Sequence, residues 1–107
     1  MILKLDAVKN ALLKVTDKVY HYEAFEQSDQ YIVWAEDSEA SSVEADNKKQ
    51  QQTIQGTIDY FTKIEGDTTV EAIQEALNNA CISFYLNSVQ YEDETKFIHY
   101  EWVFEVV

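Results

Sequence analysis

The first apolar positions of the chain fall at the spacing of a helix. They recur every three or four residues and share one helical face: Ile2, Leu5, Val8, Leu12 and Val15. We expect this helix to end near residues 16–18, where a lysine favours a helix C-terminus.

Two strand-like segments follow the first helix. Residues 19–24 and 30–36 are rich in β-branched and aromatic side chains, and a polar turn at 26–29 separates them. This spacing predicts an antiparallel hairpin. Residues 37–52 contain one isolated valine and no useful period, so we interpret them as a long polar loop with strand extensions at its ends.

The second half of the chain predicts a strand, a helix and a hairpin. Residues 53–64 alternate with period two and share an apolar face: Ile54, Ile58, Tyr60 and Ile64. Residues 68–80 predict a helix in which Thr68 and Glu71 form a capping box. Residues 82–91 and 97–107 predict a hairpin around a turn at 92–96. The last strand has the clearest alternation, with Ile98, Tyr100, Trp102, Phe104 and Val106 on one face.

These elements together predict an α+β fold with the order α-β-β-β-α-β-β. An antiparallel sheet of about five strands, with both helices packed on one face, is the simplest way to bury all the apolar stripes. No internal repeat and no Pro/Ser-rich linker interrupts the sequence. We therefore expect a single domain over residues 1–107.

The charge balance narrows the classes of partner. The chain has 20 acidic residues against 8 basic ones, all of them lysine, for a net charge of −12. Nucleic-acid binders need a basic face to neutralise phosphates, and anionic membrane surfaces repel an acidic protein. We therefore expect no specific nucleic-acid binding and no membrane association. The acidity favours a basic partner protein or a crowded assembly, or else it serves only solubility.

The residue types that carry catalysis or bind metals are few. The lone cysteine, Cys81, is interpreted as a buried structural thiol, and neither His21 nor His99 lies in a recognisable motif. The acids between residues 37 and 46 resemble a calcium loop only superficially, because the glycine and the closing glutamate of an EF-hand are missing. The sequence therefore predicts no catalytic residue, no cofactor and no metal site. With one cysteine and no apolar leader, we also expect a protein kept inside a cell.

Aromatic side chains are the remaining candidates for function. Seven tyrosines and two tryptophans are too many for the core of a chain of 107 residues. Tyrosine and tryptophan are enriched at protein interfaces, although they also favour strands. We interpret part of this aromatic set as interface.

Three stretches carry a resemblance to a known family. They are the strand pair at 19–23 and 31–36, the run at 55–63 followed by Asp67 and residues 70–73, and the ending at 91–104. In these patterns the chain resembles the small tail terminator and tail-completion proteins of long-tailed bacteriophages and prophages.

The resemblance implies an α+β domain that assembles as a ring, commonly a hexamer, at the head-proximal end of a phage tail. Its partners would be further copies of itself, the tail-tube protein and the head-connector protein, first in the host cytoplasm and then in the virion tail. DNA would pass through the acidic lumen of the ring. The loop at 37–52 would reach a neighbouring subunit or the tube. The candidate interface residues are Trp34, Glu39, Glu44, Asp46, Lys48, Lys49, Tyr91 and His99.

Two other classes of function stay open at this point. An acidic inhibitor or immunity-type protein that blocks a basic site would also explain the charge. A small enzyme that uses Cys81 is a weaker alternative.

Overall fold

The computed structural model describes residues 2–39 and 53–107. The elements follow the order α1 (Ile2–Leu13), β1 (Val19–His21), β2 (Gln30–Glu39), β3 (Ile54–Thr62), α2 (Thr69–Asn79), β4 (Ser83–Tyr91) and β5 (Ile98–Val106). The fold is α+β, and its five-stranded sheet has the order β1-β2-β3-β5-β4. The expected order of elements, the strand number and the fold class are confirmed.

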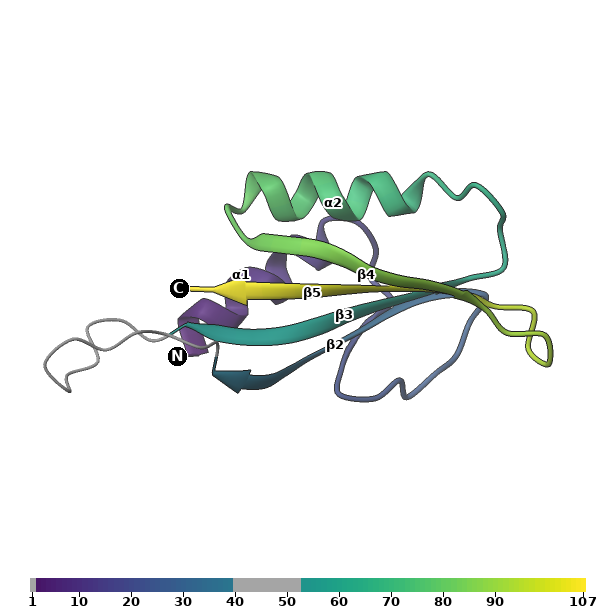
Figure 1. Cartoon of the computed structure of the whole chain (residues 1–107), viewed down its shortest axis with the longest axis horizontal. Coiled ribbons are helices and arrows are strands. Elements are labelled where there is room, and N and C mark those ends of the chain that lie inside the picture. The colour runs from purple at the N-terminus through teal and green to yellow at the C-terminus, as the bar shows by residue number, and fades with distance from the viewer. Residues whose placement is uncertain (1, 40–52) are drawn as a thin grey trace, which may run out of the picture.

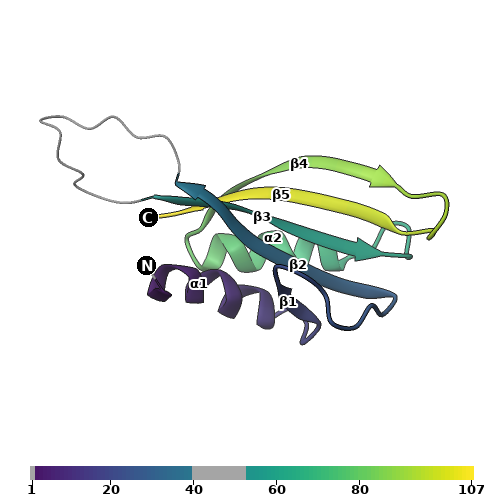
Figure 2. The ribbon, with the colours of Figure 1, turned by 90° about the horizontal axis from the view of Figure 1, so that it is seen from below.

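Both helices pack on the same face of the sheet (Figures 1 and 2). The core lies between them and alternating residues of the three central strands, where Ile58 and Trp102 are paired and fully buried. From α1 it includes Val8 and Leu12, and from α2 Ile73 and Leu77. This burial of one sheet face and two helical stripes is the main stabilising term of the fold.

The expected hairpin of the first two strands is wrong. β1 runs parallel to β2, with Val19 opposite Ile32 and His21 opposite Trp34. The chain reverses at Tyr22, whose φ of 75° is in the left-handed region, and the connection returns to the start of β2. The polar residues at 26–29 therefore belong to this return and not to a hairpin tip.

Four other expectations about the ends of helices and strands are corrected by the structure. Residues 37–39 belong to β2 and not to a loop, and the rest of the expected loop, 40–52, lies outside the described residues. α1 ends at Leu13 instead of near 16–18. Ile64 follows β3 and is exposed. Thr68 makes no capping bond through its side chain, and the carboxylate of Asp67 accepts the Thr69 N–H instead, at 2.9 Å.

Candidate interaction surface

The face of the sheet opposite the helices carries a row of stacked rings. Across the central strands, Tyr31 stacks on Phe61 with centroids 4.8 Å apart, and Phe61 stacks on His99 at 4.3 Å. Phe97 meets both Tyr31 and Phe61 edge-on. Tyr31 and Phe97 are only 5% and 8% exposed, and Phe61 and His99 are half-buried. The row is therefore fixed in place, and only its Phe61 and His99 side is partly open to a partner.

His99 is tied to a carboxylate at the centre of this face. Its Nε2 lies 2.7 Å from Oδ1 of Asp59, on the neighbouring strand β3. This hydrogen bond raises the pKa of His99 against the opposing effect of its partial burial, and the charges of Asp59, Glu92 and Glu101 add to the increase. Below its raised pKa, His99 therefore carries a positive charge beside the carboxylate of Asp59 on this face.

The β1–β2 connection covers one part of this face and leaves a pocket of about 270 Å³ beneath it. The pocket is lined by Tyr22, Glu23, Ala24, Gln27, Tyr31, Val33, Asp59, Phe61 and His99. Its walls combine aromatic and aliphatic side chains with four polar ones: Glu23, Gln27 and the paired His99 and Asp59.

A second aromatic stack lies at the β1 edge of the sheet. The ring of His21 is sandwiched between Tyr22 at 4.0 Å and Trp34 at 3.9 Å. Glu36 accepts hydrogen bonds from the Tyr22 hydroxyl and pairs with His21, each at 2.7 Å. Partial burial works to raise the pKa of Glu36, but these bonds outweigh it and lower the pKa. The exposed ring of Tyr22 is therefore held in one position.

A buried polar cluster lies on the helix side. The carboxylate of Asp67 accepts hydrogen bonds from the hydroxyls of Tyr60 and Thr62 at 2.6 and 2.7 Å, and from the Gln30 amide at 2.9 Å. Burial works to raise the pKa of Asp67, but the bonds from Tyr60, Thr69 and Thr62 hold it far below its ordinary range. Burial and the nearby Asp67 both raise the pKa of Tyr60.

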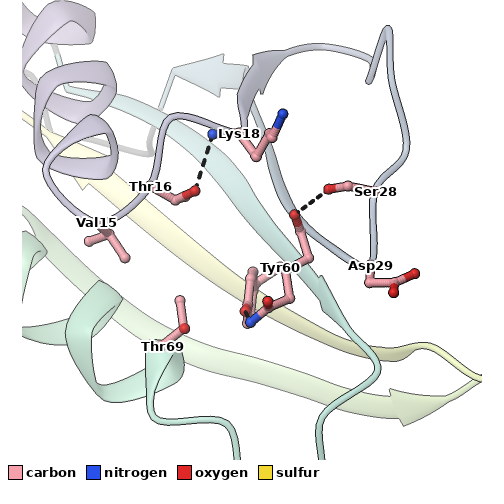
Figure 3. Close-up of a pocket in the computed structure, with 8 residues that line it drawn as sticks. Val15, Thr16, Lys18, Ser28, Asp29, Tyr60 and Thr69 are labelled. Atoms are coloured by element: carbon pink, nitrogen blue, oxygen red, sulfur yellow. Dashed lines mark hydrogen bonds between the residues drawn. The ribbon is translucent and has the colours of Figure 1, made fainter.

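A cavity of about 430 Å³ adjoins this cluster (Figure 3). It lies between the end of α1, the β1–β2 connection and the start of α2, and it is lined by Val15, Thr16, Lys18, Ser28, Asp29, Gln30, Tyr60 and Thr69. Among the described residues, every buried side-chain nitrogen or oxygen has a hydrogen-bond partner. The cluster joins β2 and β3 to the start of α2 through the hydrogen bonds of Asp67.

The expectation for Cys81 is wrong, because its side chain is exposed. Cys81 follows α2 with a φ of 58°, and this left-handed turn leads the chain out of the helix before β4. Within residues 2–39 and 53–107, no three His, Cys, Asp or Glu side chains gather where they could hold a metal ion. No helix in the same residues is long and apolar enough to cross a membrane.

The candidate interface residues are dispersed. Trp34 is only 3% exposed and belongs to the core. Glu39 is exposed at the end of β2, Tyr91 at the end of β4, and His99 lies on the open face. Glu44, Asp46, Lys48 and Lys49 lie outside the described residues. The four described residues lie in different parts of the sheet, and the roles of all eight at an interface stay predictions.

The exposed apolar side chains of β4 and of the β1–β2 connection were missed from sequence. Leu86 and Val89 are exposed in β4, and Phe25 is exposed among the polar residues of the β1–β2 connection. The available signal was the lack of any charged residue in Ser83–Tyr91, within a chain that is 26% charged.

Comparison with known proteins identifies a shared fold. No protein-family model and no curated protein matches the sequence. A chain in a solved structure of the virion of a native gene transfer agent particle is similar, with a TM-score of 0.58 and 14% sequence identity. The superposition covers 94% of this chain and 90% of that chain. At this level of identity the likeness shows the fold alone.

Proposed function

We propose that this protein is a structural component of a phage-like virion, and that it acts as a tail terminator or tail-completion protein. In this role it forms a ring, a hexamer in the family that it resembles, on the end of the tail tube. The ring stops tube growth and contacts the head connector. Its localisation would be the host cytoplasm during assembly and then the virion tail.

The observation that carries this proposal is the match to the gene transfer agent virion chain. The match extends over 94% of this chain and 90% of the other, so both share the whole arrangement of elements and not one common motif. It agrees with the resemblance of the strand and helix patterns to tail terminator proteins. Fold alone does not establish function, and the proposal therefore rests also on the surfaces.

The surfaces support assembly. Among the described residues, exposed apolar side chains lie at the sheet edges, and the stacked rings of the open face are partly exposed at Phe61 and His99. The strand register brings four strand ends together at one end of the sheet. They are the start of β2, the end of β3, the end of β4 and the start of β5. The connections at this end carry more exposed acids, including Glu65, Asp93 and Glu94, than exposed lysines, which are Lys63 and Lys96. Lys63 lies 3.5 Å from the carboxylate of Asp29. An acidic end suits a ring opening through which DNA moves without binding.

Deletion of the gene in the phage or prophage that carries it tests this role. We expect tails of abnormal length, or tails without heads, in negative-stain micrographs, and normal particles when the gene is supplied in trans. Gold-labelled protein should bind at the junction of head and tail. Normal tails with attached heads in the deletion strain would refute the proposal. Stoichiometric capture of one basic enzyme from a lysate would instead favour the inhibitor class.

A further inference from the structure

The two edges of the sheet carry most of the exposed apolar side chains. Of the nine large hydrophobic side chains that are exposed among the described residues, four lie in β4: Tyr85, Leu86, Val89 and Tyr91. Two more, Tyr22 and Phe25, lie in the connection that follows β1. Because β1 and β4 are the outermost strands, these two groups lie on opposite edges of the molecule (Figure 2).

The β4 strip is the row formed by Leu86, Val89 and Tyr91. These residues pair with Trp102, Tyr100 and Ile98, so they point to the helix side of the sheet. A bulge at Asn87 shifts the register between Leu86 and Ser88 and keeps the whole row on that side. Phe84, at the start of the strand, packs against the core. Beyond it the three side chains are 44%, 51% and 58% exposed.

The β1 patch consists of Tyr20, Tyr22 and Phe25. Phe25 is 81% exposed, and its ring meets that of the half-buried Tyr20 edge-on at 6.4 Å. Tyr22 is fixed by its stack on His21 and its bond to Glu36. Rigid aromatic side chains of this kind lose little entropy on binding, and they are the usual anchors of protein interfaces.

The lack of charged residues in β4 indicates which kind of partner covers the β4 strip. No residue of Ser83–Tyr91 is charged, and Asn87 donates a hydrogen bond to the carboxylate of Glu101 on the neighbouring strand at 2.7 Å. Exposed edge strands are normally protected by charged residues, by proline or by bulges, and of these β4 has only the bulge at Asn87. A basic partner would find no carboxylate on this strand. A second copy, which also carries −12, can approach closely only through such an uncharged surface.

We propose that the β4 strip of one copy packs against the β1 patch of the next. Two different patches on opposite edges produce head-to-tail contacts, which close into a ring when the rotation between copies allows it. The inference deepens the proposed function, on which it rests, by naming the contact between neighbouring subunits.

Paired cysteines test this contact in the full chain. On a Cys81→Ser background, Val89→Cys and Phe25→Cys are made separately with tags of different size, and are then treated with a short bifunctional thiol reagent. We expect a cross-linked band only when the two variants are mixed. Gln90→Cys is the matched control, because Gln90 pairs with His99 and faces the other side of the same strand. Mixed with Phe25→Cys, it should cross-link much less.

The alternative outcomes are distinct. If Val89→Cys alone cross-links as much as the mixture with Phe25→Cys, two β4 edges pair symmetrically. That result would overturn the head-to-tail contact. The lack of a cross-link in the mixture would overturn it too. In light scattering, Val89→Lys should raise the concentration for half-association by about tenfold, whereas Gln90→Lys should leave it nearly unchanged. Circular dichroism shows whether each variant folds.

Failure of the contact and failure of the proposed function can be told apart. If Val89→Lys and Phe25→Lys both restore normal tails in the deletion strain, the protein belongs to the virion but this contact is wrong. If the deletion strain has normal tails, the proposed function is wrong, whatever the cross-linking shows.

Discussion

Asp67 joins three elements of the fold through one carboxylate. It accepts hydrogen bonds from Gln30 on β2, from Tyr60 and Thr62 on β3, and from the first backbone N–H of α2. We expect Asp67→Asn to lower the free energy of unfolding by about 2–3 kcal/mol, because an amide turns a donor toward other donors. Urea unfolding followed by circular dichroism measures this loss. Asp93→Asn, in the exposed β4–β5 turn, should change it by less than about 0.5 kcal/mol.

The pH dependence of stability gives a second prediction for the same residue. The pKa of Asp67 is lower in the folded protein than in the unfolded chain, so the unfolded chain binds more protons at acidic pH. Its contribution is complete above the ordinary aspartate pKa of about 4 and is lost as the pH falls toward the folded value. The free energy of unfolding, measured between pH 3 and 7, should therefore depend less on pH in Asp67→Asn than in the unmodified protein. Equal slopes for both proteins would contradict this prediction.

His99 responds in the opposite direction. Its pKa is raised by Asp59, so the stabilisation is complete below the ordinary value of 6.5 and is lost as the pH rises through the raised pKa. We expect Asp59→Asn to lower the pKa of His99, as measured by titration of its imidazole signals in NMR spectra. Glu105→Gln changes a residue near the other end of the same strand and should leave the titration of His99 unchanged.

At the scale of elements, periodicity predicted the central strands and failed where the chain reverses. β3 alternates strictly and β5 does so from Trp102 onward, because the helices cover one face of the sheet. The predicted rows are buried except for Ile64, which is exposed, and Ile98 and Tyr100, which are half-buried. β1 was predicted as half of a hairpin, because a polar turn between two strand-like segments has the same composition as the return of a parallel connection. The parallel pairing distinguishes the two, and composition reveals neither this pairing nor the left-handed φ of Tyr22.

The surface was less predictable than the core. Burial follows from apolar periodicity, whereas an interface depends on which apolar residues the helices leave uncovered. Trp34 was expected at an interface, but it lies beneath the ring of His21 in the core. Leu86 and Val89 have the composition of core residues and become exposed because they lie on an edge strand.

Close approach of β2 and β5 to β3 requires glycine at position 56. A Cβ at this position would meet the carbonyl oxygen of Ala35 and would lie 2.7 Å from the ring of Phe104. We expect Gly56→Ala to destabilise the protein by about 3 kcal/mol, measured by thermal or urea unfolding. Gly66→Ala is the control, because no atom lies within 4 Å and only its φ of 69° is unfavourable, which costs about 1 kcal/mol. An equal decrease in the free energy of unfolding for Gly56→Ala and Gly66→Ala would contradict the steric argument.

At the scale of the whole molecule, charge and apolar edges have opposite effects on association. A net charge of −12 repels further copies at long range, whereas the uncharged β4 strand removes this repulsion only at the contact itself. A partner of opposite charge would instead be attracted over the whole surface. The salt dependence of binding therefore separates self-assembly from inhibition of a basic protein.

We expect association between copies to strengthen as salt is added. At 20 mM salt the repulsion between acidic surfaces extends over more than about 20 Å, and at 0.5 M it is screened within about 4 Å. Light scattering over a range of protein concentrations should show a larger mean mass at the higher salt. In Val89→Lys the mean mass should not increase with salt, because salt does not restore the apolar contact. A complex with a basic partner would weaken under the same change, so a mass that falls with added salt would contradict self-assembly through the sheet edges.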